Sequence, residues 1–253
     1  MLNAAIKAAK EAGKIIIKSM KNKRIIDYKS AVNILTDTDL IAEKKILSII
    51  KRKFPKHNFY TEESLGKETV SGHLWVIDPL DGTTNFFHTF PHFCISIAHL
   101  YNGKVDLGVI YDPFRKELFH AVIGKGAFLN NKKIAVSNIE KLSDALLITG
   151  FAYERGEILK KNLRLIDKFF DMGIQGIRRT GSAALDLCYI ACGRADGYWE
   201  FALKPWDHAA GSLIVTEAGG GITKINGEDY EVFSNDIIAS NSRIHEQMFQ
   251  ILR

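Results

Sequence analysis

The sequence predicts a mixed α/β fold, with an antiparallel sheet in the N-terminal half and strands alternating with helices in the C-terminal half. Two amphipathic stretches open the chain, and two asparagine-containing turns then join short apolar runs as in β-hairpins. After about residue 145 strand and helix patterns alternate, which is typical of α/β proteins. We therefore expect an α+β half over residues 1–144 and an α/β half over residues 145–253.

The N-terminal elements follow from hydrophobic spacing and turn residues. Alanine and isoleucine recur at helical spacing from about residue 3 to 20 and predict a first helix. The short polar side chains of 36–39 suit the start of a second helix, which ends at Phe54-Pro55. Asn102-Gly103 and Asn130-Asn131 are typical of hairpin turns. The strands expected around them are 58–61, 74–77, 93–100, 105–111 and 134–136.

The C-terminal elements alternate in type. Strands are expected at 145–149, 196–200 and 237–240, and helices at 157–171, 182–192, 208–218 and 242–252. The chain contains no repeat, low-complexity tract or evident linker, so the two halves are expected to form one body. A cleft between them is the natural place for a ligand.

Composition excludes several classes of protein. The chain has 46% hydrophobic and 25% charged residues and a net charge of +5, which is ordinary for a globular protein. Its lysines and arginines form no block dense enough for a nucleic-acid site, and no apolar stretch is long enough to span a membrane. Three cysteines make no disulfide framework, so we expect buried free thiols in a cytoplasmic protein.

The run Asp78-Pro79-Leu80-Asp81-Gly82-Thr83 is the strongest chemical signal. An apolar strand leads directly into two aspartates, and the proline between them stiffens the backbone. Such a turn can aim both carboxylates and the Leu80 carbonyl at one point, and hard oxygen ligands of this kind suit Mg²⁺. Gly82 permits a close approach of the backbone, and amides at a helical turn beginning at Thr83 can bind phosphate. The run thus predicts a divalent metal beside a phosphate.

Other polar residues each have a structural explanation beside a functional one. Glu62 and Glu63 follow a strand candidate and are most simply solvated, while Asp39 and Asp207 suit the first turns of helices. His88 and His92 stand four residues apart after the acidic run. Shaping the surrounding aromatic loop is favoured for them over binding zinc.

Four segments together resemble the signatures of the inositol monophosphatase family. The similarity runs in order from the first helix to the last, and 203–207 is especially similar to the bacterial branch. The segments are Thr61-Glu62-Glu63-Ser64, 75–86, Trp206-Asp207-His208-Ala209-Ala210-Gly211 and Thr216-Glu217-Ala218-Gly219-Gly220.

The resemblance implies a layered α/β/α/β/α sandwich, a homodimer and Mg²⁺-dependent hydrolysis of inositol monophosphate. It also implies two or three Mg²⁺ ions: the first on Glu62, Asp78 and the Leu80 carbonyl, the second on Asp78, Asp81 and Asp207, and a weaker third beside Glu62.

Roles in catalysis and substrate binding come from the same resemblance. Asp39 and Thr83 match the pair that, with the first metal on Glu62, orients and deprotonates the attacking water. The amides of Gly82 and Thr83 match phosphate contacts, and Gly181-Ser182 matches a Gly-Thr pair of some relatives. Groups that bind the substrate's hydroxyls match Asp81, Ala183 and Glu200.

Several functions remain open. A fructose-1,6-bisphosphatase or bifunctional sugar phosphatase is the main alternative; Glu200 disfavours it by repelling a second phosphate, although Lys204 weakens that argument. The short loop between Glu63 and Trp75 disfavours a nucleotide 3′-phosphatase. A binding role at RNA polymerase or the antitermination machinery is an alternative of another class, which a pI near 8.9 permits without direct nucleic-acid binding. Inhibition by Li⁺ is a further implication of the family.

Overall fold

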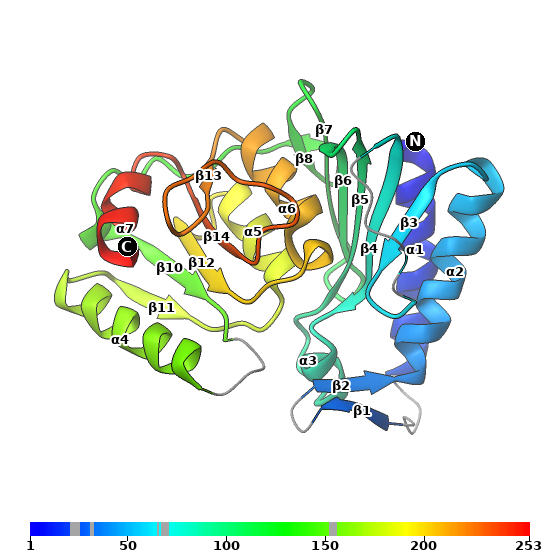
Figure 1. Ribbon diagram of the computed structural model, residues 1–253, viewed down its shortest axis with the longest axis horizontal. Helices are drawn as coiled ribbons and strands as arrows, with labels where there is room; N and C mark the ends of the chain where they lie inside the picture. Colours follow the sequence, from blue (N-terminus) through cyan, green and yellow to red (C-terminus); the bar gives the residue numbers. More distant parts are fainter. Residues whose placement is uncertain (21–25, 31–32, 65, 67–70, 152–155) are drawn as a thin grey trace.

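Two helices form the first layer of the structure and cover one face of the larger sheet (Figure 1). The computed structural model describes residues 1–20, 26–30, 33–64, 66, 71–151 and 156–253. Helix α1 (Leu2–Ser19) turns a row of buried alanines and Ile16 inward, and α2 (Asp37–Lys53) packs beside it through Ile46 and Ile50. Alanine favours a helix, and its small side chain allows the backbone of α1 to lie close to the strands beneath it.

The larger sheet forms the second layer and is antiparallel except at one edge. Its order is β3-β4-β5-β6-β7-β8-β9, and only the β3–β4 pair is parallel among its described pairs. Both expected hairpin turns are confirmed, since Asn102 and Gly103 have φ of 49° and 78°, and Asn130 and Asn131 have φ of 47° and 65°. The strands are β3 (Asn58–Thr61), β4 (His73–Asp81), β5 (Cys94–Tyr101), β6 (Lys104–Asp112), β7 (Glu117–Val122), β8 (Ala127–Leu129) and β9 (Lys132–Lys133).

The strand expected at 134–136 is wrong. The two-residue turn sets the register so that pairing with β8 begins directly at Lys132 and ends at Lys133. The chain then leaves the sheet edge: the N–H of Val136 donates to the carbonyl of Ala218, and Ile134 and Val136 pack against the middle of the molecule. Their apolar side chains reflect this burial rather than strand pairing.

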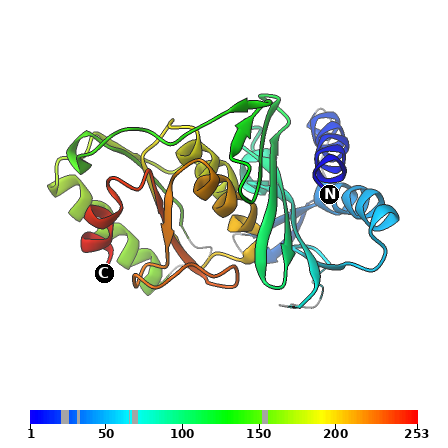
Figure 2. The ribbon, with the colours of Figure 1, turned by 90° about the horizontal axis from the view of Figure 1, so that it is seen from above.

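Two helices form the central layer and separate the sheets (Figure 2). They are α5 (Ala183–Ala191) and α6 (Pro205–Glu217). A Cβ at Gly108 of β6 would lie 2.6 Å from the carbonyl oxygen of Ala210, and one at Gly211 would lie 2.6 Å from Leu187. Glycine at these two positions therefore allows α6 to contact both the larger sheet and α5 closely.

The second sheet and two outer helices complete five layers, which confirms the expected α/β/α/β/α sandwich (Figure 1). The sheet order is β11-β10-β12-β14-β13, with β10 parallel to β11 and β12 and the other pairs antiparallel. Its elements are β10 (Leu146–Thr149), β11 (Gly176–Arg178), β12 (Gly197–Phe201), β13 (Gly221–Thr223) and β14 (Asp236–Ser240), covered by α4 (Glu157–Asp171) and α7 (His245–Leu252).

Some elements were not expected from the sequence. They include a separate hairpin of β1 (Ile26–Ser30) and β2 (Asn33–Thr36), strands β7, β8, β11 and β13, and the 3₁₀ turn Leu142–Asp144. Helix α6 begins at Pro205 rather than residue 208, and α7 at His245 rather than 242. Residues 65 and 67–70 of the loop before Trp75 lie outside the described residues. Among the described helices, none is long and apolar enough to cross a lipid bilayer.

One buried amide joins the outer helix to the second sheet. Asn162 of α4 donates to the Gly150 carbonyl at 2.7 Å and accepts from the indole N–H of Trp199 at 2.7 Å. Asn162 is 2% exposed and Trp199 is fully buried, so water cannot replace these bonds.

Asn162→Leu should destabilise the protein by about 1–3 kcal/mol, because it leaves the buried indole N–H unpaired and removes the amide's bond to the Gly150 carbonyl. Denaturant unfolding measures the change. The control is Arg164→Ala on the exposed face of the same helix, which should change stability by less than about 0.5 kcal/mol. Equal stability of the two variants would show that the amide bonds contribute nothing.

Candidate active site

The acidic run lies where β4 ends and its pairing with β5 becomes irregular. Asp78 pairs with Ser96 and Asp81 with Cys94, so three steps along β4 match two along β5. Within this bulge the N–H of Leu80 donates to Asp78 Oδ1 at 2.8 Å. The local turn thus brings the two carboxylates and the Leu80 carbonyl to the same cavity.

That cavity has a volume of about 240 Å³ and receives residues from both halves of the chain. The predicted residues among its lining are Glu62, Asp78, Leu80, Asp81, Gly82, Thr83, Ala183, Glu200 and Asp207. Other lining residues include Gly150, Phe151, Arg179, Ser182 and Lys204. Groups as far apart in the sequence as Glu62 and Asp207 are thus brought together.

The carboxylates of the cavity repel one another. Burial raises the pKa of Asp78 well above its usual value, and the charges of Glu62, Asp81 and Asp207 raise it further. Burial also raises the pKa of Asp81 to about 6, although hydrogen bonds from Ser182 and Ala184 lower it. This clustering of negative charge favours the binding of cations.

Asp207 reaches the cavity from the first turn of α6, as expected for an acid at a helix start. Asp207 Oδ2 accepts a hydrogen bond from the Lys204 N–H at 2.7 Å. The carbonyl of the preceding residue, Trp206, accepts a hydrogen bond from the Ser96 hydroxyl. Burial and the charge of Asp81 raise the pKa of Asp207 well above its usual value. The residue therefore caps the helix with one oxygen while its carboxylate lies beside Asp81.

Asp39 and Thr83 form a buried pair behind the acidic run. Asp39, in the first turn of α2, is fully buried, and its Oδ1 lies 3.1 Å from the Thr83 hydroxyl. The same hydroxyl lies 3.0 Å from the Leu80 carbonyl oxygen. Thr83 lines the cavity while Asp39 supports it from outside, so the structure places the predicted pair in contact.

Gly82 makes the turn from β4 into the short helix α3 (Thr83–Phe87). Its φ is 90°, and a Cβ there would lie 2.9 Å from the carbonyl oxygen of His92. Asn85 of α3 then donates to the carbonyls of His92 and Thr180, at 2.7 and 2.8 Å. These bonds attach the turn to the second half of the chain.

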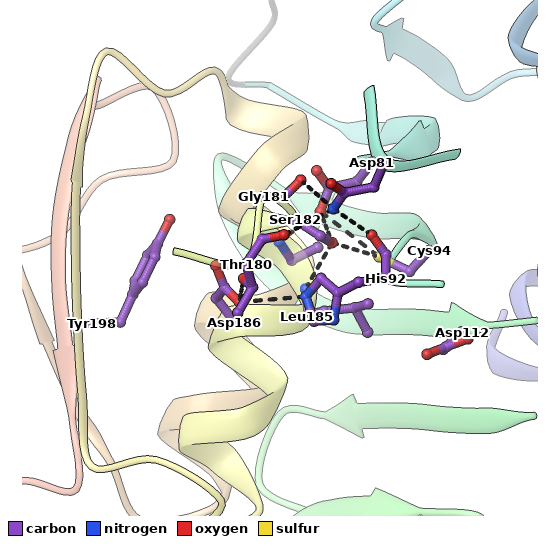
Figure 3. Close-up of polar contacts among 12 residues, drawn as sticks. Asp81, His92, Cys94, Asp112, Thr180, Gly181, Ser182, Leu185, Asp186 and Tyr198 are labelled. Atoms are coloured by element: carbon purple, nitrogen blue, oxygen red, sulfur yellow. Dashed lines mark hydrogen bonds and ion pairs between the residues drawn. The ribbon is translucent and has the colours of Figure 1, made fainter. Parts of the chain in front are cut away.

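Figure 3 shows Asp81 held by the start of α5. Asp81 Oδ2 accepts from the Ser182 hydroxyl at 2.6 Å and from the Ala184 N–H at 2.8 Å. The sequence suggested Ser182 only through its family match. Its position as the N-cap of α5, where it also accepts from the Leu185 N–H, is the local signal that could have identified it.

A second buried acid, Asp186, lies behind this contact and was missed by sequence analysis (Figure 3). It accepts a hydrogen bond from the Thr180 hydroxyl, and its Oδ1 lies 3.6 Å from Nε2 of His92. Burial raises the pKa of Asp186, while the His92 and Thr180 contacts lower it. His92 thus contacts the α5 acid, and His88 is exposed, an arrangement that suits the expected loop role.

Glu200 of β12 lies across the cavity from the acidic run. Its Oε2 accepts from the Tyr198 hydroxyl at 2.5 Å, and burial raises the pKa of Glu200 to about 8. A Cβ at Gly150 would lie 2.0 Å from the same oxygen, so a glycine at 150 makes room for the carboxylate. Arg179 and Lys204 add positive charge to the lining.

The donor set fits a hard divalent cation. Five acidic residues, Glu62, Asp78, Asp81, Glu200 and Asp207, line the cavity together with Leu80, and oxygen donors are those that Mg²⁺ prefers. The raised pKa values show the cost of keeping these acids together without positive charge.

Comparisons with known proteins agree along the whole chain. The model of the inositol monophosphatase family matches residues 1–253. The Nus factor SuhB of Escherichia coli is 40% identical over 256 residues, which cover 100% of this chain and 96% of that protein.

Solved structures show the same fold. The inositol monophosphatase from Anabaena superposes with a TM-score of 0.90 at 41% identity, over 99% of this chain and 94% of the other. SaIMPase-II bound to inositol monophosphate superposes with a TM-score of 0.83 at 28% identity, over 98% and 92% of the two chains.

The metal-free protein should lose stability as pH rises from 7 to 8.5. The folded-state pKa of Glu200 is raised to about 8, so near pH 7 the folded state holds a proton that the unfolded chain has lost; the pKa values of Asp78 and Asp207 are shifted in the same direction. Each such proton changes the free energy of unfolding by up to about 1.4 kcal/mol per pH unit. His208, whose pKa burial lowers to about 4, is neutral in both states in this window.

Thermal melts of chelator-treated protein measure this loss. Added Mg²⁺ should raise the melting temperature more at pH 8.5 than at pH 7, because the ligands must be deprotonated. Asp78→Asn should reduce both the loss of stability with rising pH and the increase in melting temperature on adding Mg²⁺. A metal-free melting temperature that is flat or rises over this range would contradict the account.

Proposed function

The chain belongs to the inositol monophosphatase family, and from this premise we propose that it hydrolyses myo-inositol 1-phosphate to inositol and phosphate with Mg²⁺. The observation that carries the proposal is the meeting of Glu62, Asp78, Asp81, Asp207 and the Leu80 carbonyl in one cavity. SaIMPase-II, a relative with the same fold, binds inositol monophosphate, which supports the choice of substrate.

The residues present define where cations would be held. A first Mg²⁺ would be held by Glu62, Asp78 and the Leu80 carbonyl. A second would be held by Asp78, Asp81 and Asp207, and a third would lie beside Glu62. When bound, such ions lower the pKa of a coordinated water and neutralise charge on the transferring phosphoryl group.

Thr83 and Asp39 are suited to take the proton of the attacking water. The Thr83 hydroxyl can donate its hydrogen to Asp39 Oδ1, 3.1 Å away, and its oxygen then accepts a hydrogen bond from water in the cavity. Asp39 is fully buried, so its carboxylate is kept from bulk solvent and directed at Thr83. The amides of Gly82 and Thr83 are proposed to bind the phosphate.

We infer that hydrolysis proceeds directly to water. Cys94 lies near Asp81, with its Sγ 3.8 Å from Asp81 Oδ2, but burial and the charge of Asp81 raise the pKa of the thiol well above its usual value. A protonated, buried thiol is a poor nucleophile. The proposal therefore includes no phosphoenzyme.

Asp81, Ala183 and Glu200 are proposed to bind the substrate's hydroxyls. Glu200 suits a polyol, since its carboxyl group can hydrogen-bond hydroxyl groups and, once cations in the cavity favour its ionised form, repels a second phosphate. Arg179 and Lys204 line the same cavity and support fructose 1,6-bisphosphate as the alternative substrate. A homodimer and inhibition by Li⁺ remain expectations from the family.

A role in transcription is a second candidate, because several relatives at about 40% identity are named Nus factor SuhB. Such a role would use the outer surface rather than the cavity. Asp78→Asn distinguishes the two, since it removes a cavity carboxylate and leaves the surface intact.

Asp78→Asn should lower the release of phosphate from inositol 1-phosphate by at least about a hundredfold, because it removes the carboxylate shared by two proposed cation positions. Steady-state assays with excess Mg²⁺ measure this. Asp167→Asn, on the exposed face of α4, is the matched control and should retain full activity. If neither the intact protein nor the control released phosphate from any sugar phosphate, the enzyme proposal would fail. Binding to transcription complexes that survives Asp78→Asn would support the second role.

Glu200→Gln should raise KM for inositol 1-phosphate by about tenfold in the Mg²⁺-loaded enzyme, because the carboxylate that cations in the cavity help to ionise is lost as an acceptor for substrate hydroxyls. The same change should reduce the ratio of kcat/KM for inositol 1-phosphate to kcat/KM for fructose 1,6-bisphosphate, since residue 200 no longer repels the second phosphate. Kinetics with both substrates measure the ratio. An unchanged ratio would mean that Glu200 does not select the substrate.

A further inference from the structure

Three histidines from separate parts of the chain meet at the opposite end of β4 from the acidic cavity. His57 lies in the turn between α2 and β3, His73 begins β4, and His99 lies in β5. One ring nitrogen of each lies within 4.8 Å of those of the other two. We propose that His57, His73 and His99 form a second metal site, selective for Zn²⁺ or a similar transition-metal ion.

The spacing of two of the nitrogens already suits a tetrahedral ion. Nδ1 of His73 lies 3.2 Å from Nε2 of His99. Two nitrogens bound to tetrahedral Zn²⁺ at 2.0–2.1 Å stand about 3.3 Å apart. An ion between these rings therefore needs little change in the β4–β5 pair, whose register runs from His73 opposite Tyr101 to Trp75 opposite His99 and beyond.

Asp106 orients the buried member of the cluster. Its Oδ1 lies 2.6 Å from Nδ1 of His99, a residue that is fully buried. A proton shared at Nδ1 leaves the lone pair of Nε2 directed toward His73. Carboxylate, histidine and metal in this order form a common arrangement, in which the acid fixes the ring and increases its basicity. The irregular β5–β6 register at His99 and Leu100 accompanies this contact.

His57 supplies the third nitrogen from a partly exposed turn. Its ring stacks on that of His73, with centroids 4.1 Å apart and planes at 3°. Nδ1 of His57 accepts from the indole N–H of the fully buried Trp75 at 3.1 Å. An ion bound at Nδ1 would displace the indole N–H, and an ion bound by both stacked rings requires His57 to turn out of the stack, because each lone pair lies in the plane of its ring. Water would fill the fourth position.

The protonation state of His57 favours the binding of a cation. Burial lowers the pKa of His57, and positive charge on His73 and His99 would lower it further, although Asp106 opposes the shift. A neutral imidazole is the form that binds metals. Two aromatic side chains also pack against the cluster: Phe54 contacts the ring of His57, and Tyr101 contacts the ring of His73.

The cluster is chemically distinct from the proposed Mg²⁺ site. His73 and Asp78 are five residues apart on β4, a separation of about 16 Å at the usual rise of a strand. Nitrogen donors favour Zn²⁺, Co²⁺ and related ions, whereas carboxylate and carbonyl oxygens favour Mg²⁺. The two sites should therefore be filled independently when both ions are present.

Titration of the intact protein with Co²⁺, in the presence of excess Mg²⁺, tests the proposal. The wild type should bind one further equivalent, with the intense visible absorption of tetrahedral Co²⁺ and a change in tryptophan fluorescence from Trp75. Zn²⁺ should abolish the absorption. His57→Gln and His73→Gln should each weaken binding by about 10-fold or more. The exposed His88→Gln, which lies outside the cluster, is the matched control.

Melting temperatures measured with Mg²⁺ alone show whether the variants are folded, and both cluster variants should retain Mg²⁺-dependent phosphatase activity. The proposal would be overturned if the Mg²⁺-loaded wild type bound no Co²⁺ or Zn²⁺. It would also be overturned if folded His57→Gln and His73→Gln bound these ions as tightly as the wild type, in which case the cluster serves packing only. Since activity is measured separately, failure here is distinguishable from failure of the proposed function.

Discussion

Asp81 joins the larger sheet to the central helix layer at the point where the site is built. Its Oδ2 accepts from the hydroxyl of Ser182 and the N–H of Ala184, so a carboxylate at the end of β4 caps the first turn of α5. A negative charge at a helix start is stabilised by the amides there and by the helix dipole. Because α5 packs against α6 and the second sheet, this contact also sets where Asp207 and Glu200 stand relative to Asp78.

The same contact limits what the fold can tolerate. Asp78, Asp81 and Asp207 have raised pKa values because they are buried beside one another, so the metal-free cavity costs stability at neutral pH and above. A cation offsets both the burial and the repulsion. The fold therefore gathers acidic groups whose ionised forms a bound cation would stabilise. The alanine-rich α1 and the large apolar core supply the stability that this arrangement requires.

Strand β4 carries different chemistry at its two ends. Its C-terminal end presents carboxylates and a carbonyl to the central cavity, while its first residue, His73, meets two other histidines on the face covered by α1 and α2. Trp75 and Ile77 lie between them and are fully buried. A rigid, apolar strand separates the two groups, so each can be occupied without altering the other.

Features that depend on neighbouring residues could be predicted from the amino-acid sequence. The asparagine turns, the strand leading into Asp78 and the helix over 157–171 follow from local backbone preferences and spacing, and the site residues followed from motifs that resemble one family. The division into 1–144 and 145–253 stays a prediction. The remaining features depend on how the elements pack against one another. The three-residue strands β11 and β13 exist because neighbouring strands pair with them, and Ile134 and Val136 are buried without being a strand. Asp186 beside His92, Gly150 beside Glu200 and the three clustered histidines are far apart along the chain, so their contacts depend on how helices and sheets dock, which short-range patterns do not encode.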